Sequence, residues 1–418
     1  MGDENIIKLP GKKKRIRSLP DRPDWIDRCI LGSNGQPIAD LANTLIGLRQ
    51  DPLLINCFAF DEMLRATMLM EALPGKELEG QRLVTDNDVG IVQEYLQRLG
   101  LPRVSQNTVC QAIDMKGAEE SFHPVCKYLE GLEWDGKPRL HLWLHLYLGA
   151  EQSLYAAEIG KMALISMVAR VFQPGCKCDY ALVLEGPQGT GKSRACQILG
   201  GDYYSDSLPD VTGGKDVSQH LAGKWLIEVA EMSALSKAEA SALKAFLTRQ
   251  DERYRPSYGR KEVIEPRQCV FIGTTNKTAY LKDETGNRRF WPVRVGKVDT
   301  EALAEDRDKL FAEATHLFKE GTRWWPDSAF EAEHITPQQE SRFENDVWSE
   351  AIASYLTSRD KVFVGQVARD CLDMKTERIG RADQNRITAI LERLGWSRLP
   401  KDPRGNIAWG PSNPRMTG

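Results

Sequence analysis

The residues best suited to chemistry form one short glycine-rich run. Gly186 and Gly191 are separated by four residues, and Lys192 and Ser193 follow directly. In this spacing, glycines let backbone N–H groups face a phosphate, the lysine reaches the β- and γ-phosphates, and the serine hydroxyl can ligate Mg²⁺. The residues that we expect to contact a nucleotide are Gly186, Pro187, Gln188, Gly189, Thr190, Gly191, Lys192, Ser193 and Arg194.

The flanking residues supply the strand and the helix that such a loop needs. The apolar run ALVL precedes it, and the run KSRACQILGG has apolar residues at helical spacing. This order places phosphates at the positive end of a helix dipole. The alternative is a plain turn that closes a hairpin, but a hairpin needs neither Lys-Ser nor a helix after it. We therefore expect ATP and Mg²⁺ as the cofactors of this loop.

Two acidic residues follow in the run KWLIEVAE at 224–231, whose apolar character is typical of a strand covered on both faces. Glu231 falls where this strand is expected to end. We expect Glu231 to hold Mg²⁺ with Ser193 or to polarise water, because hydrolysis needs an acid on the metal side. Glu228 is the second choice, and its alternative is a solvent-facing position on an edge strand.

Polar side chains also lie at the ends of the next two expected strands. Asn276 closes the run CVFIGTTN, where it can hydrogen-bond a γ-phosphate or the attacking water; the alternative is an ordinary turn residue. Arg288 and Arg289 stand just before the run RRFWPVRV. An arginine that completes a neighbouring subunit's site accelerates phosphoryl transfer, whereas the alternative is a salt bridge to Asp283 or Glu284.

A basic and aromatic segment, TRQDERYRPSYGRKEVIEPRQ at 248–268, separates the two central runs. Cations that follow a backbone and rings that stack on bases are typical of single-stranded nucleic-acid binding. The alternative is a solvated loop, since four acidic residues dilute the charge. The residues that we expect to contact DNA are Arg253, Arg255, Tyr258, Arg260 and Lys261.

The elements that must position these residues indicate an α/β fold. The runs at 180–185, 224–231, 269–276 and 288–295 are rich in β-formers and alternate with helical patterns. We expect four parts, listed in chain order: a disordered basic tail at 1–22, a helical N-terminal domain at 23–165, a P-loop domain at 166–327 and a small C-terminal domain at 340–418.

The C-terminal part has the pattern of helices followed by a hairpin. The run DQNRITAILERLGW predicts an amphipathic helix with Asp383 as its N-cap, and the turn at 402–405 separates two short strands. This order suggests a winged helix that could place Arg386 or Arg393 near DNA. The alternative is a lid or docking domain without DNA contact.

Composition restricts the class of protein further. The chain has 418 residues, 41% hydrophobic and 28% charged, with a net charge of −3, as in ordinary globular proteins. No apolar run approaches the roughly 18 residues of a membrane span, and the N-terminus lacks a secretory signal pattern. Nine scattered cysteines favour reduced thiols, so we expect a cytoplasmic location.

Beyond single motifs, long stretches of the chain resemble the virulence-associated protein E family of phages, prophages and pathogenicity islands. The shared stretches are FHPVCKYLEGLEWDGKPRL, ARVFQPGCKCDYALVLEGPQGTGKS, AGKWLIEVAEM, RYRPSYGRK and RQCVFIGTTNKTAYLKDETGNRRFWPV. The resemblance implies an AAA+ type P-loop ATPase related to superfamily 3 helicases and phage primase-helicases. In those relatives the motor is a ring, usually a hexamer, that acts on single-stranded DNA in replication.

The resemblance also implies roles for single residues. Lys192 and Ser193 match the Walker A pair, Glu231 matches the Walker B acid, Asn276 matches the sensor, and Arg288 or Arg289 matches the arginine finger. Many relatives have two adjacent acids at Walker B, whereas here Ala230 precedes Glu231. The division between metal ligand and water activator therefore stays open. Some relatives carry an upstream primase domain, and primer synthesis is not expected here.

Together these patterns predict an ATP-dependent DNA motor of a phage or mobile element in a bacterial host. One alternative is an ATP-gated DNA-binding module that assembles without unwinding. A second is a small-molecule P-loop kinase, which the Asn276 strand and the run GNRRF disfavour.

Overall fold

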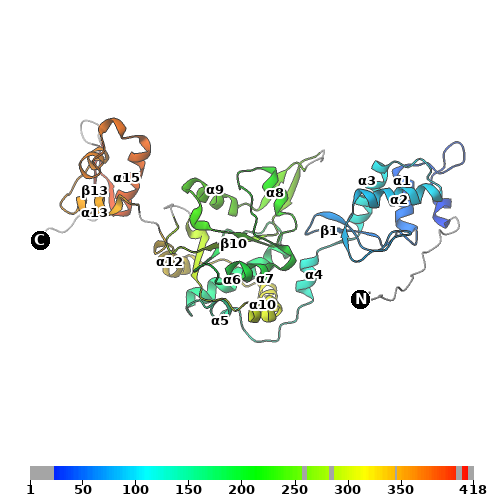
Figure 1. The fold of residues 1–418 in the computed structure, drawn as a ribbon, viewed down its shortest axis with the longest axis horizontal. Coiled ribbons are helices and arrows are strands. Elements are labelled where there is room, and N and C mark those ends of the chain that lie inside the picture. Colours follow the sequence, from blue (N-terminus) through cyan, green and yellow to red (C-terminus); the bar gives the residue numbers. More distant parts are fainter. Residues whose placement is uncertain (1–22, 257–260, 282–286, 344–345, 402–406, 413–418) are drawn as a thin grey trace, which may run out of the picture. The chain divides into compact units, whose positions relative to one another are not determined.

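The computed structural model describes residues 23–256, 261–281, 287–343, 346–401 and 407–412 (Figure 1). The chain divides into two compact units. The first takes in the described residues up to Thr278 together with Arg288–Gln338, and the second takes in the described residues of Ala279–Asn287 and those from Gln339 onward. The basic tail predicted at 1–22 lies outside the described residues.

The first unit begins with a small α/β part. Its four-stranded sheet has the order β3-β2-β1-β4, and its apolar core is formed by side chains such as Trp25, Leu48 and Leu96. The sequence predicted helices here but not this sheet, whose strands are two to four residues long. The elements are η1 (Asp24–Arg28), α1 (Leu41–Gln50), β1 (Phe58–Asp61), β2 (Ala66–Leu69), β3 (Arg82–Leu83), α2 (Asp86–Leu99), α3 (Gln106–Glu119) and β4 (Ser121–Phe122).

The larger part of the first unit is built on a five-stranded parallel sheet of order β11-β5-β10-β7-β6. Four of the strands fall within the runs predicted from sequence, which confirms a mixed α/β fold with a parallel sheet. Sequence analysis did not predict β6, which has only two residues. The strands are β5 (Ala181–Glu185), β6 (Tyr204–Ser205), β7 (Leu226–Val229), β10 (Val270–Thr275) and β11 (Phe290–Arg294).

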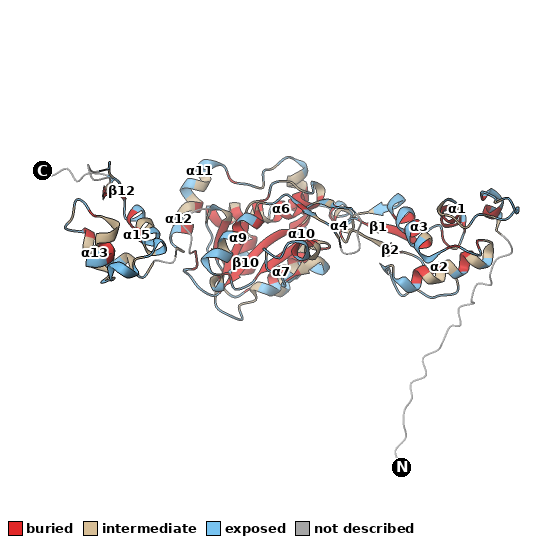
Figure 2. Cartoon of the chain, turned by 90° about the horizontal axis from the view of Figure 1, so that it is seen from above, coloured by how far each residue is buried: buried red, intermediate tan, exposed pale blue. Residues whose placement is uncertain are grey.

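Helices cover both faces of this sheet, so the three central strands β5, β10 and β7 are buried along their length (Figures 1 and 2). Val270 and Ile272 belong to the core cluster that also holds residues of α6, α7 and α10, whereas the Phe271 ring packs on Phe246 of α9 at 5.6 Å between centroids. Alternate side chains of β10 therefore face opposite layers. The helices are α4 (Pro124–Glu130), α5 (Trp143–Leu148), α6 (Leu154–Phe172), α7 (Lys192–Gly200), η2 (Gly201–Tyr203), α8 (Lys215–Leu221), η3 (Met232–Ala234), α9 (Lys237–Leu247), η4 (Asn287–Arg289), α10 (Thr300–Lys319), α11 (Ser328–Phe330) and η5 (Glu331–Ile335).

The four-part division predicted from sequence stays a prediction. Its boundary at 165/166 falls inside α6, a continuous 19-residue helix whose apolar side chains join the core under the sheet. A helix that packs on the sheet along its length must fold with that sheet. The sheet-bearing part of the molecule therefore includes residues before 166.

The second unit has its own core, formed by side chains such as Ile352, Ile387, Leu391 and Trp409. Helices and a two-stranded sheet are present where the sequence predicted helices and a hairpin, but the winged-helix assignment stays a prediction. The turn predicted at 402–405 lies outside the described residues. The short helix α12 (Thr336–Glu340) begins in the first unit and ends in the second. The other elements of the second unit are α13 (Ser349–Leu356), α14 (Val364–Gln366), η6 (Val367–Cys371), η7 (Thr376–Arg378), α15 (Arg381–Arg393), β12 (Trp396–Arg398) and β13 (Trp409–Pro411).

The N-cap predicted for α15 was wrong. Gly380 is the N-cap, and Asp383 is the third residue of the helix, where its carboxylate accepts a hydrogen bond from the Gly380 N–H at 3.0 Å. Asp383 therefore serves the reciprocal half of a capping box. The prediction failed because Arg381 and Ala382 add the first residues of the helix before the amphipathic pattern begins.

Arg386 and Arg393, the predicted DNA contacts of this unit, both contact other side chains of the same unit. The Arg386 guanidinium donates to Asp346 at 2.5 and 2.8 Å and lies over the Trp348 ring at 3.7 Å. The Arg393 guanidinium lies 3.7 Å from the centroid of the Phe343 ring. Their role in DNA contact stays a prediction, and these pairings give both arginines a structural role.

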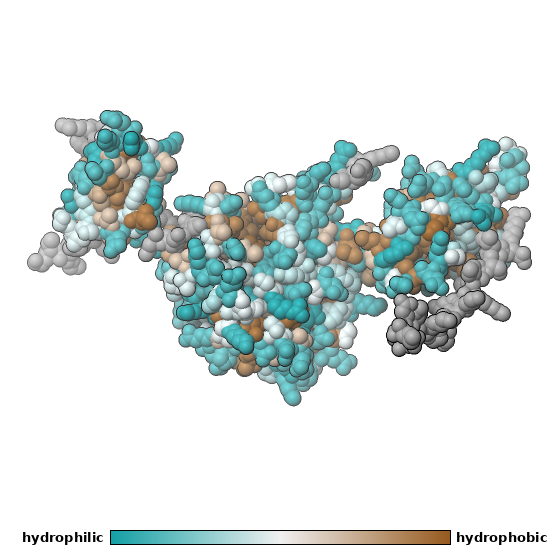
Figure 3. All heavy atoms as spheres, in the orientation of Figure 1, coloured by the Kyte–Doolittle hydropathy of each residue, from teal (hydrophilic) through white to brown (hydrophobic). Residues whose placement is uncertain are grey.

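Hydrophilic side chains cover most of the face of the molecule seen in Figure 3, with hydrophobic side chains gathered in smaller patches. Such a mixed surface is normal, because apolar atoms contribute more than half of the accessible surface of folded proteins. Within the described ranges, every helix is too short or too polar to cross a membrane.

Candidate active site

The glycine-rich run forms a tight loop between β5 and α7. Gly189 and Gly191 have φ angles of +80° and +98°, a region that residues with a Cβ rarely adopt. A Cβ on Gly186 would stand 3.0 Å from the Val295 carbonyl oxygen, and one on Gly191 would stand 3.0 Å from the Val298 Cβ. The glycines are therefore required by both conformation and close packing.

This loop leads directly into the N-terminus of α7. Gly191 is the N-cap, and no side chain of the described residues caps the helix there. The first amides of a helix need an acceptor from outside, and together with the helix dipole they favour an anion. The loop and the first turn of α7 thus have the geometry of a phosphate cradle.

Lys192 lies across this loop. Its ammonium donates to the carbonyl oxygens of Gly186 at 2.7 Å and Pro187 at 2.8 Å. Burial lowers the pKa of Lys192, and the nearby charge of Glu228 opposes that shift. The ammonium is thus held over the same backbone that would surround a phosphate.

A buried carboxylate stands beside the first turn of α7. Glu228 on β7 is 1% exposed, and the Ser193 hydroxyl donates to its Oε1 at 2.7 Å. Thr274 Oγ1 donates to the same oxygen at 2.6 Å, and the Tyr204 hydroxyl donates to Oε2. The structure therefore brings Glu228, the second choice from sequence, to the serine that was expected to ligate Mg²⁺.

Glu231 has a different environment. β7 ends at Val229, so Glu231 lies in the turn that leads into η3, where its side chain is exposed. Its backbone has φ +49° and ψ +45°, a left-handed conformation that is uncommon for glutamate. Among the described contacts, no hydrogen bond joins Glu231 to Ser193. The prediction that these two residues share a metal is not supported by contact between them.

Asn276 follows β10 at the carboxyl ends of the parallel strands, where the glycine-rich loop also begins. Thr275 stands opposite Glu185 in the parallel register of β10 and β5, and the Gly186 N–H donates to the Thr275 carbonyl at 3.1 Å. Asn276 itself is exposed. The backbone of Asn276 therefore lies close to the start of the glycine-rich loop, and its role as a sensor stays a prediction.

Arg288 and Arg289 lie at the amino ends of the parallel strands, on the side of the sheet away from the glycine-rich loop. They belong to η4, which precedes β11, and Phe290 stands opposite Ala181 at the start of β5. Because β5 has five residues at about 3.3 Å each, the arginines and the loop are about 17 Å apart along the sheet. Asp283 and Glu284, the alternative salt-bridge partners, lie outside the described residues.

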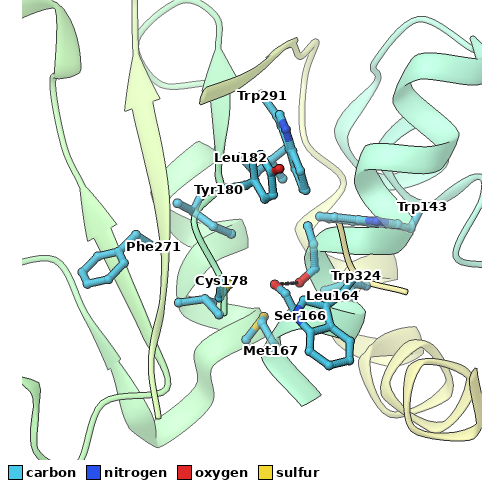
Figure 4. A pocket seen from close by; sticks show the side chains of 13 residues that line it. Trp143, Leu164, Ser166, Met167, Cys178, Tyr180, Leu182, Phe271, Trp291 and Trp324 are labelled. Carbon is cyan, nitrogen blue, oxygen red and sulfur yellow. Dashed lines mark hydrogen bonds between the residues drawn. The ribbon is translucent and has the colours of Figure 1, made fainter. Parts of the chain in front are cut away.

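The interior beside this edge is filled by aromatic side chains (Figure 4). Tyr180 stacks on Trp291 with 4.7 Å between ring centroids, and Trp143 and Trp324 line the same space. The remaining cavity measures only about 10 Å³, at the lower limit for a single water. The residues of Figure 4 thus form a packed support for β5, β10 and β11 and leave no room for a ligand.

The basic segment forms an antiparallel hairpin of β8 (Asp251–Tyr254) and β9 (Val263–Pro266). Arg253 is exposed opposite Ile264, which is 58% exposed, and Lys261 is also exposed. Tyr258 and Arg260 lie outside the described residues, whereas Arg255 follows β8 directly and is exposed.

Two of the four acidic residues that dilute the charge of this hairpin are engaged at its base. Glu252 is buried and accepts from Arg267 Nε at 2.6 Å and Ser218 Oγ at 2.6 Å. Glu265 accepts from the Tyr254 hydroxyl at 2.9 Å and pairs with Arg65 at 2.5 Å. The outward side of the hairpin is therefore more basic than the sequence count suggests.

The fold and the site define a class: a parallel α/β protein in which a glycine-rich loop leads into a helix whose Ser193 contacts a buried acid, Glu228, on β7. A family model described as the virulence-associated protein E-like domain matches residues 129–345, just over half of the chain. The chain belongs to the virulence-associated protein E-like domain family.

Solved structures of the NrS-1 C terminal region are also similar to this chain. One apo structure is 17% identical, with 81% of this chain and 86% of that chain covered and a TM-score of 0.40. A second, the A form, is 15% identical, with 85% and 96% covered and a TM-score of 0.43. None of the curated proteins compared with the chain matches it.

Two residues of the site, Tyr204 and Thr274, were not predicted from the sequence. Thr274 stands in the run GTTN, two residues before Asn276, so its approach to an adjacent strand end was open to prediction. Tyr204 is 24 residues from Glu228 along the chain and reaches it only because β6 pairs with β7. No local pattern in the sequence signals that pairing.

Proposed function

We propose that this chain hydrolyses ATP with Mg²⁺ as an AAA+ type motor that acts on single-stranded DNA during replication of a phage or mobile element. The observation that carries the proposal is the hydrogen bond from Ser193, at the start of α7, to the buried Glu228. A hydroxyl and an acid in this relation to a phosphate loop are the parts that hold a nucleotide-bound metal in P-loop ATPases.

The residues of the loop fit a triphosphate by their shape and their donors. The positions of Gly186 and Gly191 exclude side chains, so the backbone can approach a ligand closely. Lys192 exchanges its carbonyl contacts for the β- and γ-phosphates, and Ser193 and Glu228 lie on the metal side. When bound, Mg²⁺ neutralises the charge that develops on the phosphates.

Two residues are candidates for orienting the attacking water. Asn276 and Glu231 are both exposed, and each follows the carboxyl end of a neighbouring strand, β10 and β7. Ligands of parallel α/β sheets bind outside the carboxyl ends of the strands. We assign Glu231 as the general base that activates the attacking water. We assign Asn276 as the residue that senses the γ-phosphate.

Hydrolysis also needs positive charge near the transferred phosphate in the transition state. Arg288 is exposed at the amino ends of the strands, whereas the loop follows their carboxyl ends. Within one chain, Arg288 and the loop are thus about 17 Å apart along the sheet. This position supports a role in the site of a neighbouring subunit and therefore a ring-shaped homo-oligomer. Arg289 is half-buried, which makes Arg288 the stronger candidate.

The hairpin of β8 and β9 supplies the proposed DNA contact. Arg253, Arg255 and Lys261 are exposed on it, and the buried ion pair of Glu252 with Arg267 fixes its base. Cations along a projecting strand pair can follow a phosphate backbone without reading sequence. An ATP-gated DNA-binding module would use the same residues and differs only in lacking strand displacement.

Strand displacement and DNA-stimulated ATP hydrolysis test the proposal together. We expect the wild-type chain to do both, Lys192→Ala to lose both, and Arg255→Ala to keep basal hydrolysis but lose its stimulation by DNA. Lys319→Ala, which removes an exposed lysine at the end of α10, is the matched control and should behave as wild type. Stimulated hydrolysis without displacement would favour the binding module instead.

A further inference from the structure

We propose that Tyr204 and Thr274 are positioning residues that lock Glu228 in the orientation that presents the Ser193 oxygen to a nucleotide-bound metal. The proposal rests on the proposed function of the phosphate loop and assigns roles to two residues outside its motifs. Tyr204 comes from β6 and Thr274 from β10, the two neighbours of β7, which carries Glu228.

The three hydroxyl groups occupy defined positions on the carboxylate. Glu228 Oε1 accepts from Ser193 Oγ at 2.7 Å and from Thr274 Oγ1 at 2.6 Å, and Oε2 accepts from the Tyr204 hydroxyl. Two oxygens with donors from both flanking strands leave the carboxylate little freedom to rotate. Glu228 itself is buried, so water does not compete freely for these positions.

The direction of each hydrogen bond follows from chemistry. An ionised carboxylate can only accept hydrogen bonds, so the single hydroxyl proton of Ser193 is donated to Glu228. Both lone pairs of the Ser193 oxygen then remain available on its exposed side, where a metal ligand is needed. If Glu228 turned away, the Ser193 hydroxyl could rotate and direct its proton toward the metal.

Tyr204 is suited to remain a donor. A phenol with the usual pKa of about 10 keeps its proton at neutral pH, so the Tyr204 hydroxyl is the donor in its hydrogen bond to Glu228. Thr274 is 5% exposed and carries a hydroxyl that cannot ionise in this range. Neither residue contacts the loop backbone among the described hydrogen bonds, so both act through Glu228.

Binding of a fluorescent ATP analogue, measured with and without Mg²⁺, tests this role without relying on activity. Tyr204→Phe and Thr274→Val each remove one hydroxyl and keep the shape of the side chain. We expect each to reduce the gain in affinity that Mg²⁺ provides by about tenfold, while affinity without metal stays within about twofold of wild type. A uniform loss in both conditions would indicate structural damage and would overturn the positioning role.

Two further variants serve as controls. Thr274→Ser restores the hydroxyl and should recover the Mg²⁺ effect. Tyr203→Phe removes a neighbouring hydroxyl for which the structure shows no contact with Glu228, and it should behave as wild type. If Tyr204→Phe fails to fold, as judged by thermal unfolding, the comparison of Thr274→Val with Thr274→Ser decides the question.

The outcomes also separate this proposal from the proposed function. A wild-type chain that does not bind the analogue would overturn the nucleotide site and the positioning role with it. A wild-type chain that binds more tightly with Mg²⁺, together with variants that show the same gain, would overturn the positioning role alone.

Discussion

At the scale of single residues, the site depends on where two glutamates lie relative to the end of one strand. Glu228 is inside β7 and reaches Ser193, whereas Glu231 is two residues beyond Val229, the last residue of the strand, and is exposed. A change of three positions along the chain thus separates a buried acid from an exposed one. We therefore expect neutralisation of Glu228 and neutralisation of Glu231 to impair different steps, nucleotide binding and hydrolysis respectively.

Glu228→Gln and Glu231→Gln test that difference. Glu228→Gln replaces an acceptor for three hydroxyls with a group that also donates, so we expect Mg²⁺-dependent nucleotide binding to weaken by about tenfold or more. Glu231→Gln should bind nucleotide with Mg²⁺ as wild type but lose at least about 100-fold in hydrolysis rate, the range of a general base. Equilibrium binding and single-turnover hydrolysis measure the two effects, and exchanged phenotypes would reverse the assignment.

Residue patterns predicted part of this site and not the rest. The loop from Gly186 to Ser193 was predicted because its glycines, lysine and serine act through local backbone geometry. The choice between Glu228 and Glu231 was not settled, because it depends on where β7 ends. The turn at Glu231 is left-handed, and the next residue, Met232, packs so closely on Gly273 that a Cβ there would meet its sulfur at 2.1 Å.

At the scale of elements, the N-terminus of α2 depends on a charged capping box. The Thr85 hydroxyl accepts from the Asp88 N–H at 3.4 Å, and Asp88 accepts from the Thr85 N–H at 2.8 Å and from Arg82 at 2.6 and 2.8 Å. Arg82 foremost, and then Thr85, overcome the effect of burial and lower the pKa of Asp88 to about 2. This part of the molecule should therefore lose stability in acid.

The sign of that pH dependence follows from the lowered pKa. The stabilisation is fully present above the ordinary value of about 4 and is lost as pH falls through the folded value of about 2. Asp88→Asn should remove most of that dependence and cost about 1 kcal/mol at neutral pH, the usual size of a cap. Urea unfolding between pH 2 and 7 measures both, and an Asp88→Asn curve parallel to wild type would contradict the prediction.

A buried ion pair between Glu252 and Arg267 holds the base of the β8–β9 hairpin. The Arg267 side chain is fully buried, its guanidinium lies 4.1 Å from the centroid of the Phe246 ring and 5.7 Å from that of Phe271, and Glu252 is its acidic partner. Burial lowers the pKa of Arg267, and the charge of Glu252 is among the effects that oppose this shift. Removing the partner would leave a buried guanidinium uncompensated.

We therefore expect Glu252→Ala to destabilise the chain by about 3–5 kcal/mol, as for other broken buried ion pairs. Asp251→Ala, one residue earlier but exposed, should stay within about 0.5 kcal/mol of wild type. Chemical denaturation measures the free energy of unfolding of both variants. Equal stability of Glu252→Ala and wild type would show that the pair does not fix the hairpin.

At the scale of the whole molecule, sequence patterns predicted the parallel sheet but not all of its parts. The runs for β5, β7, β10 and β11 are apolar and β-rich, which is typical of strands covered on both faces. The two-residue β6 and the short strands of the N-terminal sheet carry too few residues for a periodic pattern. Their positions depend on pairing with strands distant in sequence, which local propensity does not encode.

The distance between the phosphate loop and Arg288 leads to a prediction about assembly. If hydrolysis uses this arginine, the proposed function requires that it come from a neighbouring subunit, because it lies too far from the loop of its own chain. Lys192→Ala and the double variant Arg288→Ala, Arg289→Ala should each be inactive alone. Mixed, they should regain a measurable fraction of hydrolysis, because an intact loop in one subunit can meet intact arginines of the other.

Hydrolysis rates of the mixture against each variant alone measure this effect, with light scattering to confirm assembly. A mixture no more active than its components, in assembled particles, would contradict an arginine supplied in trans. Activity of the double arginine variant equal to wild type would remove these arginines from the site altogether.

The most direct test of the whole account is a calorimetric titration of the wild-type chain with a non-hydrolysable ATP analogue in the presence of Mg²⁺. We expect saturable binding that approaches one nucleotide per chain and that weakens by about 10- to 100-fold in Lys192→Ala, as for loss of a charge-assisted contact. Absence of binding by the folded wild-type chain, or equal binding by Lys192→Ala, would contradict it.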